Sequence, residues 1–587
     1  MEKPKYISNP VLDKLPMHLR QYIMPQHYDH YTPENQAVWR YAMRKNAAFL
    51  PTIAHEAFLE GLGKTGISTD VIPSMYGMNR ILEDIGWAAV AVNGLIPSAA
   101  FMEFQAYNVL VIASDIRMLE NIEYTPTPDI LHESAGHAPL VAIPEYAAYL
   151  RRFGELGAKA ISSDQDRQLF EAVRSLASLK ERTGTSSAKV KELENNIVEI
   201  QNAIKDPSEL QQIKNLHWWT IEYGLIGDVK DPKIYGAGLL SSIGESKWCM
   251  SDDVEKIPFT IEASQQAFDV TQPQPQLFVT PSFAYLSEVL EQFANTMAVR
   301  RGGKLGVSRL INSKQLGTIE LSTGLQISGL FTEMILNKKD KPAYVQTTGP
   351  TALSYREKEL IGQSTDHHPD GFGTALGNLK GINLSIEDMS PRDLQAYKIL
   401  EGEDIELVFE GDIIVKGKVQ TGTRNIHGKI MLIALQNCTV AHGERIIFHP
   451  QRGTYHLAIG MDVISAFAGP ADLTSFDLTD HSMTPLSVDT GSTEVLDAKQ
   501  LVYQKIRDGR EDTSSSINLS GLISEVLDNH RDEWLILLDT YELAIAKGNP
   551  LSADILAQLS DLEKTKPSIG HLIRDGLECI STLVSVS

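Results

Sequence analysis

Two histidines stand five residues apart in the stretch Pro128-Asp129-Ile130-Leu131-His132-Glu133-Ser134-Ala135-Gly136-His137-Ala138-Pro139-Leu140. Neutral imidazoles are good ligands for iron, copper and zinc. On an ideal α-helix five residues turn by roughly 140°, so the two rings can share a metal ion only where the helix starts or is distorted. Pro128 favours a helix start, and Gly136 permits distortion just before the second ring. These residues alone support a metal site and two ordinary helix histidines about equally.

A third candidate ligand lies downstream, in the apolar stretch Trp218-Trp219-Thr220-Ile221-Glu222-Tyr223-Gly224-Leu225. An ionised glutamate among aromatic and aliphatic neighbours is costly unless it is paired or bound to a metal ion. Together, His132, His137 and Glu222 would make a two-histidine, one-carboxylate triad, which leaves coordination positions open on ferrous iron. The alternative is that Glu222 is a surface carboxylate on an amphipathic helix.

Four ordered motifs carry a resemblance to a known family. They are Tyr124 to Ile130 running into His132–His137, then Trp218 to Leu225, Tyr235 to Glu245, and Gln274 to Val279. In this order they resemble the pterin-dependent aromatic amino acid hydroxylases, over roughly residues 30 to 300. The resemblance implies a mainly α catalytic domain of that type with small β elements. It also implies ferrous iron and a tetrahydropterin as cofactors, with O2 as co-substrate.

The resemblance further assigns roles to individual residues. The metal ligands would be His132, His137 and Glu222, and Glu222 is also the expected catalytic residue. The loop Gly94 to Ser98 would hold the pterin, with contacts from Ile96, Ser98, Phe101 and Glu133; Phe101 would stack on the pterin, and Glu133 would face the pterin rather than the metal. The expected substrate-binding residues are Arg117, Tyr124, Thr125, Trp218, Gly238, Ser241 and Val270. Arg117 and Thr125 would hold the carboxylate of the amino acid, because a guanidinium meets a carboxylate through two hydrogen bonds.

One residue bears on which aromatic ring is preferred. Val270 stands where the family varies its residue with the preferred ring, and an apolar side chain there resembles the phenylalanine-specific members, whereas tyrosine-specific members carry an acid. We therefore expect hydroxylation of phenylalanine to tyrosine, with tryptophan or tyrosine hydroxylation as the alternative. His217 departs from the phenol side chain usual in animal members.

Two other classes of protein remain open at this point. One is a zinc hydrolase built on His132-Glu133 to His137, with Glu133 as general base; the five-residue spacing and the later motifs count against it. The other is a non-enzymatic assembly protein in which the C-terminal half dominates. Intact His132, His137 and Glu222, together with Arg117 and Phe101, count against the second class.

Composition bounds the setting of the protein. The 587 residues carry 75 acidic and 53 basic side chains, a net charge of −22, which argues against a nucleic-acid surface. The chain has three cysteines, which lie far apart in the sequence. We therefore expect no disulfide framework, and this cysteine content fits a reducing cytoplasm. The start of the chain lacks the apolar core of a signal peptide, and the apolar run Trp87 to Phe101 is too short to span a bilayer. We expect a cytoplasmic protein with no nucleic-acid or membrane partner.

The residue pattern that indicates helix or strand changes several times along the chain. We expect an irregular segment at 1–30, the catalytic domain at 31–301, a β-rich domain at 302–480 and a helical C-terminal region at 481–587. The catalytic domain should carry a helical hairpin insertion at 160–207, because Val190, Leu193, Ile197, Ile200 and Ile204 form a heptad seam. This insertion or the C-terminal half would be the place for contacts between subunits.

The β-rich domain is predicted from alternating segments. These are Gly317 to Thr323, Asp404 to Phe409, Ile413 to Val419 and Lys429 to Leu435, with a tight connection at Glu410-Gly411-Asp412. The stretch Asp366-His367-His368-Pro369-Asp370-Gly371 favours a polar turn over a second metal site, because its spacing argues for no particular metal.

Overall fold

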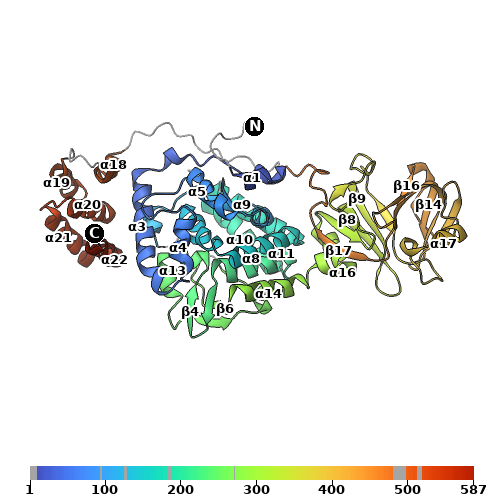
Figure 1. Cartoon of the computed structure of the whole chain (residues 1–587), viewed down its shortest axis with the longest axis horizontal. Helices are drawn as coiled ribbons and strands as arrows, with labels where there is room; N and C mark the ends of the chain where they lie inside the picture. The colour runs from blue at the N-terminus through green and yellow to red at the C-terminus, as the bar shows by residue number, and fades with distance from the viewer. Residues whose placement is uncertain are drawn as a thin grey trace.

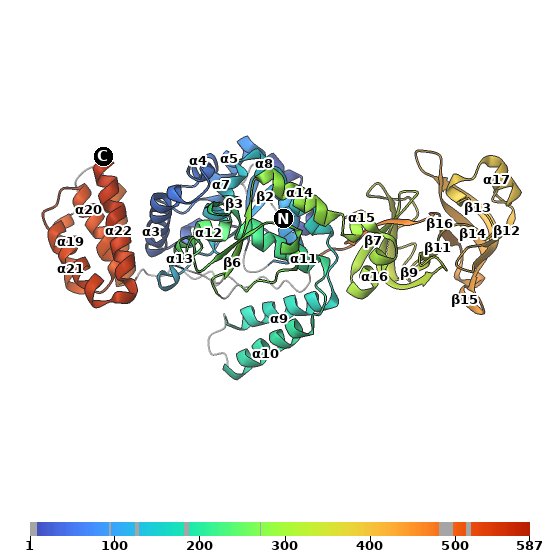
Figure 2. The same ribbon diagram turned by 90° about the horizontal axis from the view of Figure 1, so that it is seen from below.

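The computed structural model describes residues 9–92, 96–123, 128–180, 187–269, 272–479, 497–511 and 518–586. The molecule is elongated (Figure 1). The predicted catalytic domain, residues 31–301, is mainly helical and lies in the middle; it is called the catalytic part. The β-rich part lies at one end and the C-terminal helices at the other, as a view turned by 90° also shows (Figure 2). Among the described helices, none is both long enough and apolar enough to cross a membrane.

Helices form most of the catalytic part. Its α-helices are α3 (Pro33–Phe49), α4 (Ala57–Lys64), α5 (Met75–Leu82), α6 (Ser98–Ala106), α7 (Ala138–Val141), α8 (Pro144–Lys159), α11 (Glu209–His217), α12 (Ala237–Ser241), α13 (Ile243–Trp248), α14 (Phe283–Ala294) and α15 (Ala298–Arg301). Two π-helices are present, η5 (Leu131–His137) and η6 (Trp218–Glu222). Short 3-10 helices are η1 (Tyr28–His30), η2 (Leu50–Thr52), η3 (Glu83–Ile85), η4 (Leu119–Asn121) and η7 (Ile261–Gln265).

Two small sheets complete this part. Strands β1 (Ala88–Val92) and β2 (Val109–Ala113) pair in parallel. Strands β3 (Leu225–Asp228), β4 (Asp231–Ile234), β5 (Glu255–Pro258) and β6 (Gln276–Thr280) form a four-stranded sheet in the order β4-β3-β6-β5. The expectation of a mainly helical domain with small β elements is confirmed.

The N-terminal segment is more ordered than expected. Helix α3 begins as predicted, since Thr32 accepts a hydrogen bond from Asn35 and the reciprocal bond completes a capping box. The prediction that residues 1–30 are irregular is wrong for the described part, which contains α1 (Pro10–Asp13) and α2 (Met17–Arg20). The reason is tertiary: Leu15 and Leu19 are buried against β1 and β2.

The predicted hairpin insertion is present as two helices, α9 (Asp164–Lys180) and α10 (Ser187–Ala203). They pack against each other and project away from the catalytic part (Figure 2). The heptad positions Leu193, Ile197 and Ile200 are half-buried while their neighbours are exposed, as a seam requires. The base of the hairpin contacts the β-rich part, where Nζ of Lys314 lies 3.1 Å from Oδ2 of Asp164.

The β-rich part contains two antiparallel sheets. Strands β7 (Leu316–Leu321), β8 (Leu325–Leu336), β9 (Pro342–Tyr355), β10 (Lys358–Glu359), β11 (Gly373–Ala375) and β17 (Val463–Ala468) form the first. Strands β12 (Asp404–Val408), β13 (Ile413–Arg424), β14 (Ile430–His442), β15 (Arg445–Phe448) and β16 (Tyr455–Ala458) form the second. Helices α16 (Gly303–Ser313) and α17 (Pro391–Ala396) and the 3-10 helices η8 (Ile386–Asp388) and η9 (Pro450–Arg452) accompany them.

Several details of this part were predicted. The tight connection at Glu410 to Asp412 joins β12 and β13, with Asp412 at a positive φ of 58°. The first predicted strand segment, Gly317 to Thr323, corresponds to β7, and α16 precedes it and packs on β8 and β17. The predicted turn at Asp366 to Gly371 is formed by successive turns and bends. Within it, His368 is buried, and its Nε2 lies 2.8 Å from Oε1 of Gln363.

The described residues after 496 form helices α18 (Ala498–Glu511), α19 (Leu519–Asn529), α20 (Trp534–Ala546), α21 (Ser552–Thr565) and α22 (Pro567–Val586). Their buried side chains belong to the same hydrophobic cluster as those of α3. The rings of Tyr41 and Trp534 meet edge to face at 5.0 Å across this contact. The C-terminal helices therefore dock on the catalytic part through α3.

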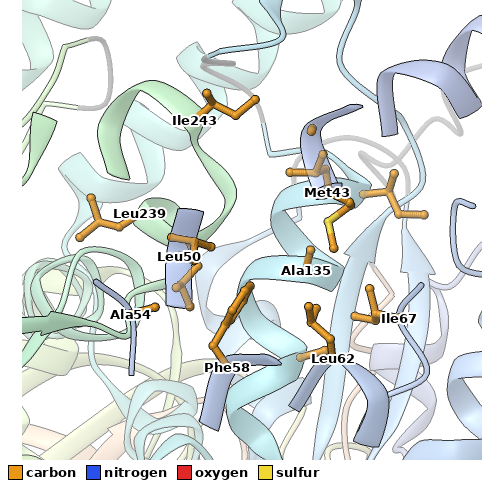
Figure 3. Close-up of a cluster of buried hydrophobic side chains, with 14 of the residues drawn as sticks. Met43, Leu50, Ala54, Phe58, Leu62, Ile67, Ala135, Leu239 and Ile243 are labelled. Carbon is orange, nitrogen blue, oxygen red and sulfur yellow. The ribbon is translucent and has the colours of Figure 1, made fainter. Parts of the chain in front are cut away.

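The core of the catalytic part surrounds the π-helix η5. Ala135, in the middle of η5, is 1% exposed. Side chains of α3, α4, α12 and α13 gather around it (Figure 3): Met43, Phe58, Leu62, Leu239 and Ile243. Dense packing of this kind leaves little room for side chains to shift, so the core fixes η5 in place.

Candidate metal centre

The five-residue spacing of His132 and His137 is resolved by the local helix geometry. Residues Leu131–His137 form a π-helix, in which backbone bonds run between residues five apart. The two rings therefore lie on the same side, with centroids 5.0 Å apart and planes at 88°. Gly136 faces α12, where a Cβ would lie 2.6 Å from the carbonyl oxygen of Ala237. The glycine thus permits the close approach of η5 and α12.

Glu222 comes from the second π-helix, η6, which closes with a bond from the Tyr223 amide to the Trp218 carbonyl at 2.8 Å. Its Oε2 lies 3.2 Å from Nε2 of His132, and its Oε1 lies 3.3 Å from Nε2 of His137. One ligand atom from each of the three residues lies within 4.8 Å of the others. The structure thus brings together the three side chains predicted as ligands.

Ser241 determines how the first histidine points. Its hydroxyl donates to the carbonyl of Ala237 at 2.8 Å, so its oxygen can accept from Nδ1 of His132 at 2.9 Å. This arrangement assigns the proton of His132 to Nδ1 and leaves the Nε2 lone pair directed at Glu222. Ser241, predicted as a substrate-binding residue, thus contacts the candidate metal ligand His132.

The donor set fits a divalent metal ion. Nε2 of His137 is buried and has no hydrogen-bond partner among the described residues, which is costly for a ring nitrogen unless a ligand completes it. Burial alone would raise the pKa of Glu222, but the neighbouring His137 and His132 hold the pKa well below its usual range. Two imidazole nitrogens and a carboxylate are the donors that suit non-haem iron.

Arg117 is buried and already carries a partner. Its Nε and Nη2 donate to the two oxygens of Asp129 at 2.8 and 2.9 Å, and its Nη1 approaches the Ser241 carbonyl at 3.3 Å. Burial would raise the pKa of Asp129, but Arg117 and the backbone of His132 hold it below its usual range. Asp129, which the sequence reasoning left without a role, orients both Arg117 and the start of η5.

Two further buried carboxyls flank the centre. Oε2 of Glu133 lies 3.7 Å from Nε2 of His137. The Glu133 carboxyl group is therefore next to a candidate metal ligand, although the resemblance implied that it would face the pterin rather than the metal. Burial raises its pKa to about 8, and nearby Glu222 adds to the effect. Burial also raises the pKa of Glu245 to about 7, although the Tyr223 hydroxyl donates to it at 2.9 Å. Sequence reasoning missed the Tyr223–Glu245 pair, whose only signal was two polar groups within apolar motifs.

His217 introduces a third imidazole beside Glu222. Its Nδ1 lies 3.5 Å from Oε1 of Glu222, and its ring meets Phe101 and Phe153 edge to face at 5.8 and 5.4 Å. Burial lowers the pKa of His217 to about 4, so the ring is neutral at pH 7. Phe101, half-buried in α6, therefore lies one ring away from the candidate ligand Glu222.

The residues expected around Phe101 come from the start of α6. Ser98 is its first residue, Ile96 precedes it, and both are partly exposed. The Phe101 amide donates to the Pro97 carbonyl at 2.9 Å, which sets the first turn. Ile96, Ser98 and Phe101 are therefore neighbours at one helix end.

Trp218 forms part of an aromatic stack. Its ring lies between Tyr223, at 4.5 Å, and Phe268, at 4.3 Å with planes 9° apart. Phe268 was not predicted from the sequence, because a single aromatic residue gives no periodic signal. Gly238 is buried, and a Cβ there would lie 2.9 Å from the Tyr223 ring. The absence of a side chain at Gly238 therefore leaves room for this ring. Tyr124, Thr125 and Val270 lie outside the described residues.

Comparison with known families gives a match over the catalytic part. The profile of the family described as biopterin-dependent aromatic amino acid hydroxylase matches residues 21–172 and 193–302. The residues between the two matched segments lie within the α9–α10 hairpin. The β-rich part beyond residue 302 and the C-terminal helices fall outside the match.

Curated relatives agree with this family. Phenylalanine-4-hydroxylase of Chromobacterium violaceum is 27% identical over 274 residues, covering 43% of this chain and 77% of that protein. The Pseudomonas aeruginosa enzyme is 27% identical over 282 residues, with 47% and 90% covered. The Rattus norvegicus enzyme is 29% identical over 274 residues, with 46% and 50% covered.

A solved structure is also similar to this chain. It is that of the Chromobacterium violaceum phenylalanine hydroxylase with bound iron(III) and the oxidised cofactor 7,8-dihydrobiopterin. The identity is 27%, the TM-score is 0.37, and the match covers 47% of this chain and 88% of the other.

Proposed function

We propose that this chain, whose residues 21–172 and 193–302 match the biopterin-dependent aromatic amino acid hydroxylase family, hydroxylates the ring of free phenylalanine to give tyrosine. The reaction uses ferrous iron, a tetrahydropterin and O2. The single observation that carries the proposal is the convergence of His132, His137 and Glu222 on one point inside a family-matched domain. Relatives of 27–29% identity that bear the name phenylalanine-4-hydroxylase support the choice of substrate.

The three ligands would hold iron on one face and leave the opposite face open. Bound iron and reduced pterin together supply the oxygen-activating chemistry, which no side chain can provide. The protein contributes the geometry: Ser241 fixes the tautomer of His132, and His137 is held in a buried position. Glu222 is the catalytic residue in this proposal, because it alone supplies the anionic ligand.

The amino acid would bind between Arg117 and the aromatic stack. Asp129 holds the guanidinium of Arg117 through two bonds, and Nη1 donates to the carbonyls of Ile122 and Ser241. The second N–H of Nη2 is the donor left for a substrate carboxylate. Trp218, stacked on Phe268, would form a wall for the ring of the substrate. Thr125, Tyr124 and Val270 keep their proposed substrate contacts from the family resemblance.

The pterin would bind at the start of α6. Phe101 offers a ring face for stacking, and Ile96 and Ser98 border it. Glu133, whose pKa is raised to about 8 chiefly by burial, is largely protonated at pH 7 and can donate a hydrogen bond to the pterin. His217 contacts both Phe101 and Glu222, so one ring joins the proposed pterin site to the proposed metal ligands.

We place the protein in the cytoplasm and propose self-association through the α9–α10 hairpin. The three cysteines are free, which suits a reducing compartment. Analytical ultracentrifugation of the full chain and of a variant with the hairpin shortened to a loop would test the association.

Anaerobic loading with iron followed by turnover tests the function. Phenylalanine, tyrosine and tryptophan would compete in one reaction with a tetrahydropterin, and the hydroxylated products would be measured by chromatography. We expect tyrosine from phenylalanine as the main product, and none from protein loaded with zinc instead of iron. Activity with zinc alone towards ester or peptide bonds would instead favour a hydrolase with Glu133 as general base.

A further inference from the structure

The C-terminal helices dock on the catalytic part through charges of opposite sign. Helix α3 presents cations, whereas α20 and α22 present acids, and the pairs are Arg40–Asp539, Arg44–Glu542 and Lys45–Asp575. The hydroxyl of Tyr41 also donates to the Leu572 carbonyl at 2.8 Å. Arg40 and Lys45 are buried by this contact. The position of α22 relative to the catalytic part is therefore well defined.

Helix α22 reaches the edge of the candidate site at two points. Nε2 of His571 donates to Oε1 of Glu123 at 2.8 Å. Asp575, one turn further along α22, accepts from Lys247 of α13 at 3.0 Å. Both contacts join residues more than 300 positions apart in the sequence, and both end on segments that border Arg117 and Ser241.

Glu123 belongs to the hydrogen-bonded wall of the site. Its carbonyl accepts from the Ser242 hydroxyl at 3.1 Å and from the Gly244 amide at 3.5 Å, which ties it to the start of α13. Ser242 directly follows Ser241, whose carbonyl accepts from Arg117 and whose hydroxyl orients His132. A displacement of Glu123 or α13 would therefore move the groups proposed to bind the amino acid.

We propose that His571 and Lys247, through Glu123 and Asp575, are positioning residues by which the docked helix α22 sets the amino acid site for tight binding. This inference rests on the proposed function. The His571–Glu123 pair is 44% and 40% exposed, so it contributes little to folding free energy. Its removal should leave the fold intact while releasing Glu123 from α22.

The test uses full-length His571→Ala and Lys247→Gln, which detach Glu123 and α13 respectively. Asp575 is left unchanged because its loss would leave the buried cation of Lys45 unpaired. Arg574→Ala is the matched control, since Arg574 lies on α22 but pairs with Glu563 inside the C-terminal helices.

We expect the two variants to raise the KM for phenylalanine by about three- to tenfold. The KM for the pterin, the iron content and kcat should change by less than about twofold. Calorimetric titration of phenylalanine into the anaerobic ferrous protein should show the same loss of affinity without any turnover. The double variant Glu123→Ala/His571→Ala should be no worse than either single variant, because both act through one contact.

An unchanged KM and dissociation constant in His571→Ala and Lys247→Gln would overturn the inference, as would an equal effect of Arg574→Ala or additive effects in the double variant. Failure of the proposed function has a different signature, because the wild-type protein would then hydroxylate no aromatic amino acid. Normal wild-type turnover with unaffected variants would refute only the positioning role.

Discussion

A single methyl group added at Gly136 should disturb the contact between η5 and α12, which supports the candidate metal centre. A Cβ at this residue would lie 2.6 Å from the carbonyl oxygen of Ala237, which is backbone and cannot rotate away. Carbon–oxygen contacts need about 3.3 Å, so in Gly136→Ala η5 and α12 must part by roughly 0.7 Å. Because α12 carries Ser241, which orients His132, the displacement reaches the ligand set directly.

The expected cost has two parts. Overpacking of a tight helix contact destabilises by about 1–3 kcal/mol. Ligand constellations tolerate shifts of only about 0.5 Å, and disturbing the groups that orient a ligand lowers metal affinity by about 10- to 100-fold. Gly136→Ala should therefore both lower the free energy of unfolding and weaken iron binding.

Urea unfolding of the metal-free protein and competition with a chelator for iron measure the two effects separately. Gly63→Ala is the matched control, because Gly63 lies in α4 and a Cβ there meets nothing within 4 Å. That substitution should stabilise the protein by about 0.5–1 kcal/mol, through better helix propensity. Wild-type iron affinity in Gly136→Ala would refute the argument that the η5–α12 contact holds the ligands in place.

Four further predictions address the site and the docked helices. Glu222→Ala should lose iron and turnover while its circular dichroism spectrum stays native; normal iron stoichiometry would sink the ligand assignment. Arg117→Lys should raise the KM for the amino acid more than that for the pterin, since lysine cannot form two parallel bonds, and equal changes in both constants would contradict this role. Burial alone would raise the pKa of Glu542, but Arg510 lowers it from 4.5 to about 2. Its contribution is therefore present above pH 4.5, and about 3 kcal/mol should be lost as the pH falls towards 2; urea titrations of Glu542→Gln that kept the full acid dependence would contradict this. Val270→Asp should reduce the preference for phenylalanine over tyrosine by about tenfold in competition turnover, and an unchanged ratio would show that this side chain does not contact the ring.

Local sequence signals were sufficient for several elements. Thr32-Pro33 predicted the start of α3, because cap and proline act within one turn. The heptad spacing predicted the α9–α10 hairpin, because periodicity reports directly which face of a helix is buried. The three candidate ligands were also identified from the sequence, because an ionisable residue among apolar neighbours is costly to bury unless it is paired or bound to a metal ion.

Tertiary contacts decided the rest. The π-helical form of η5, which turns a five-residue spacing into a shared face, depends on packing against α12 at Gly136. Asp129, Tyr223 and Phe268 acquired roles only from side-chain contacts that the fold creates, with Arg117, Glu245 and Trp218 respectively. Residues near one another in the sequence thus determined helices, caps and ligand types by themselves. The geometry of the centre and the contact of α22 with Glu123 were decided by packing, because hydrogen bonds and close approaches between distant segments exist only once the chain has folded.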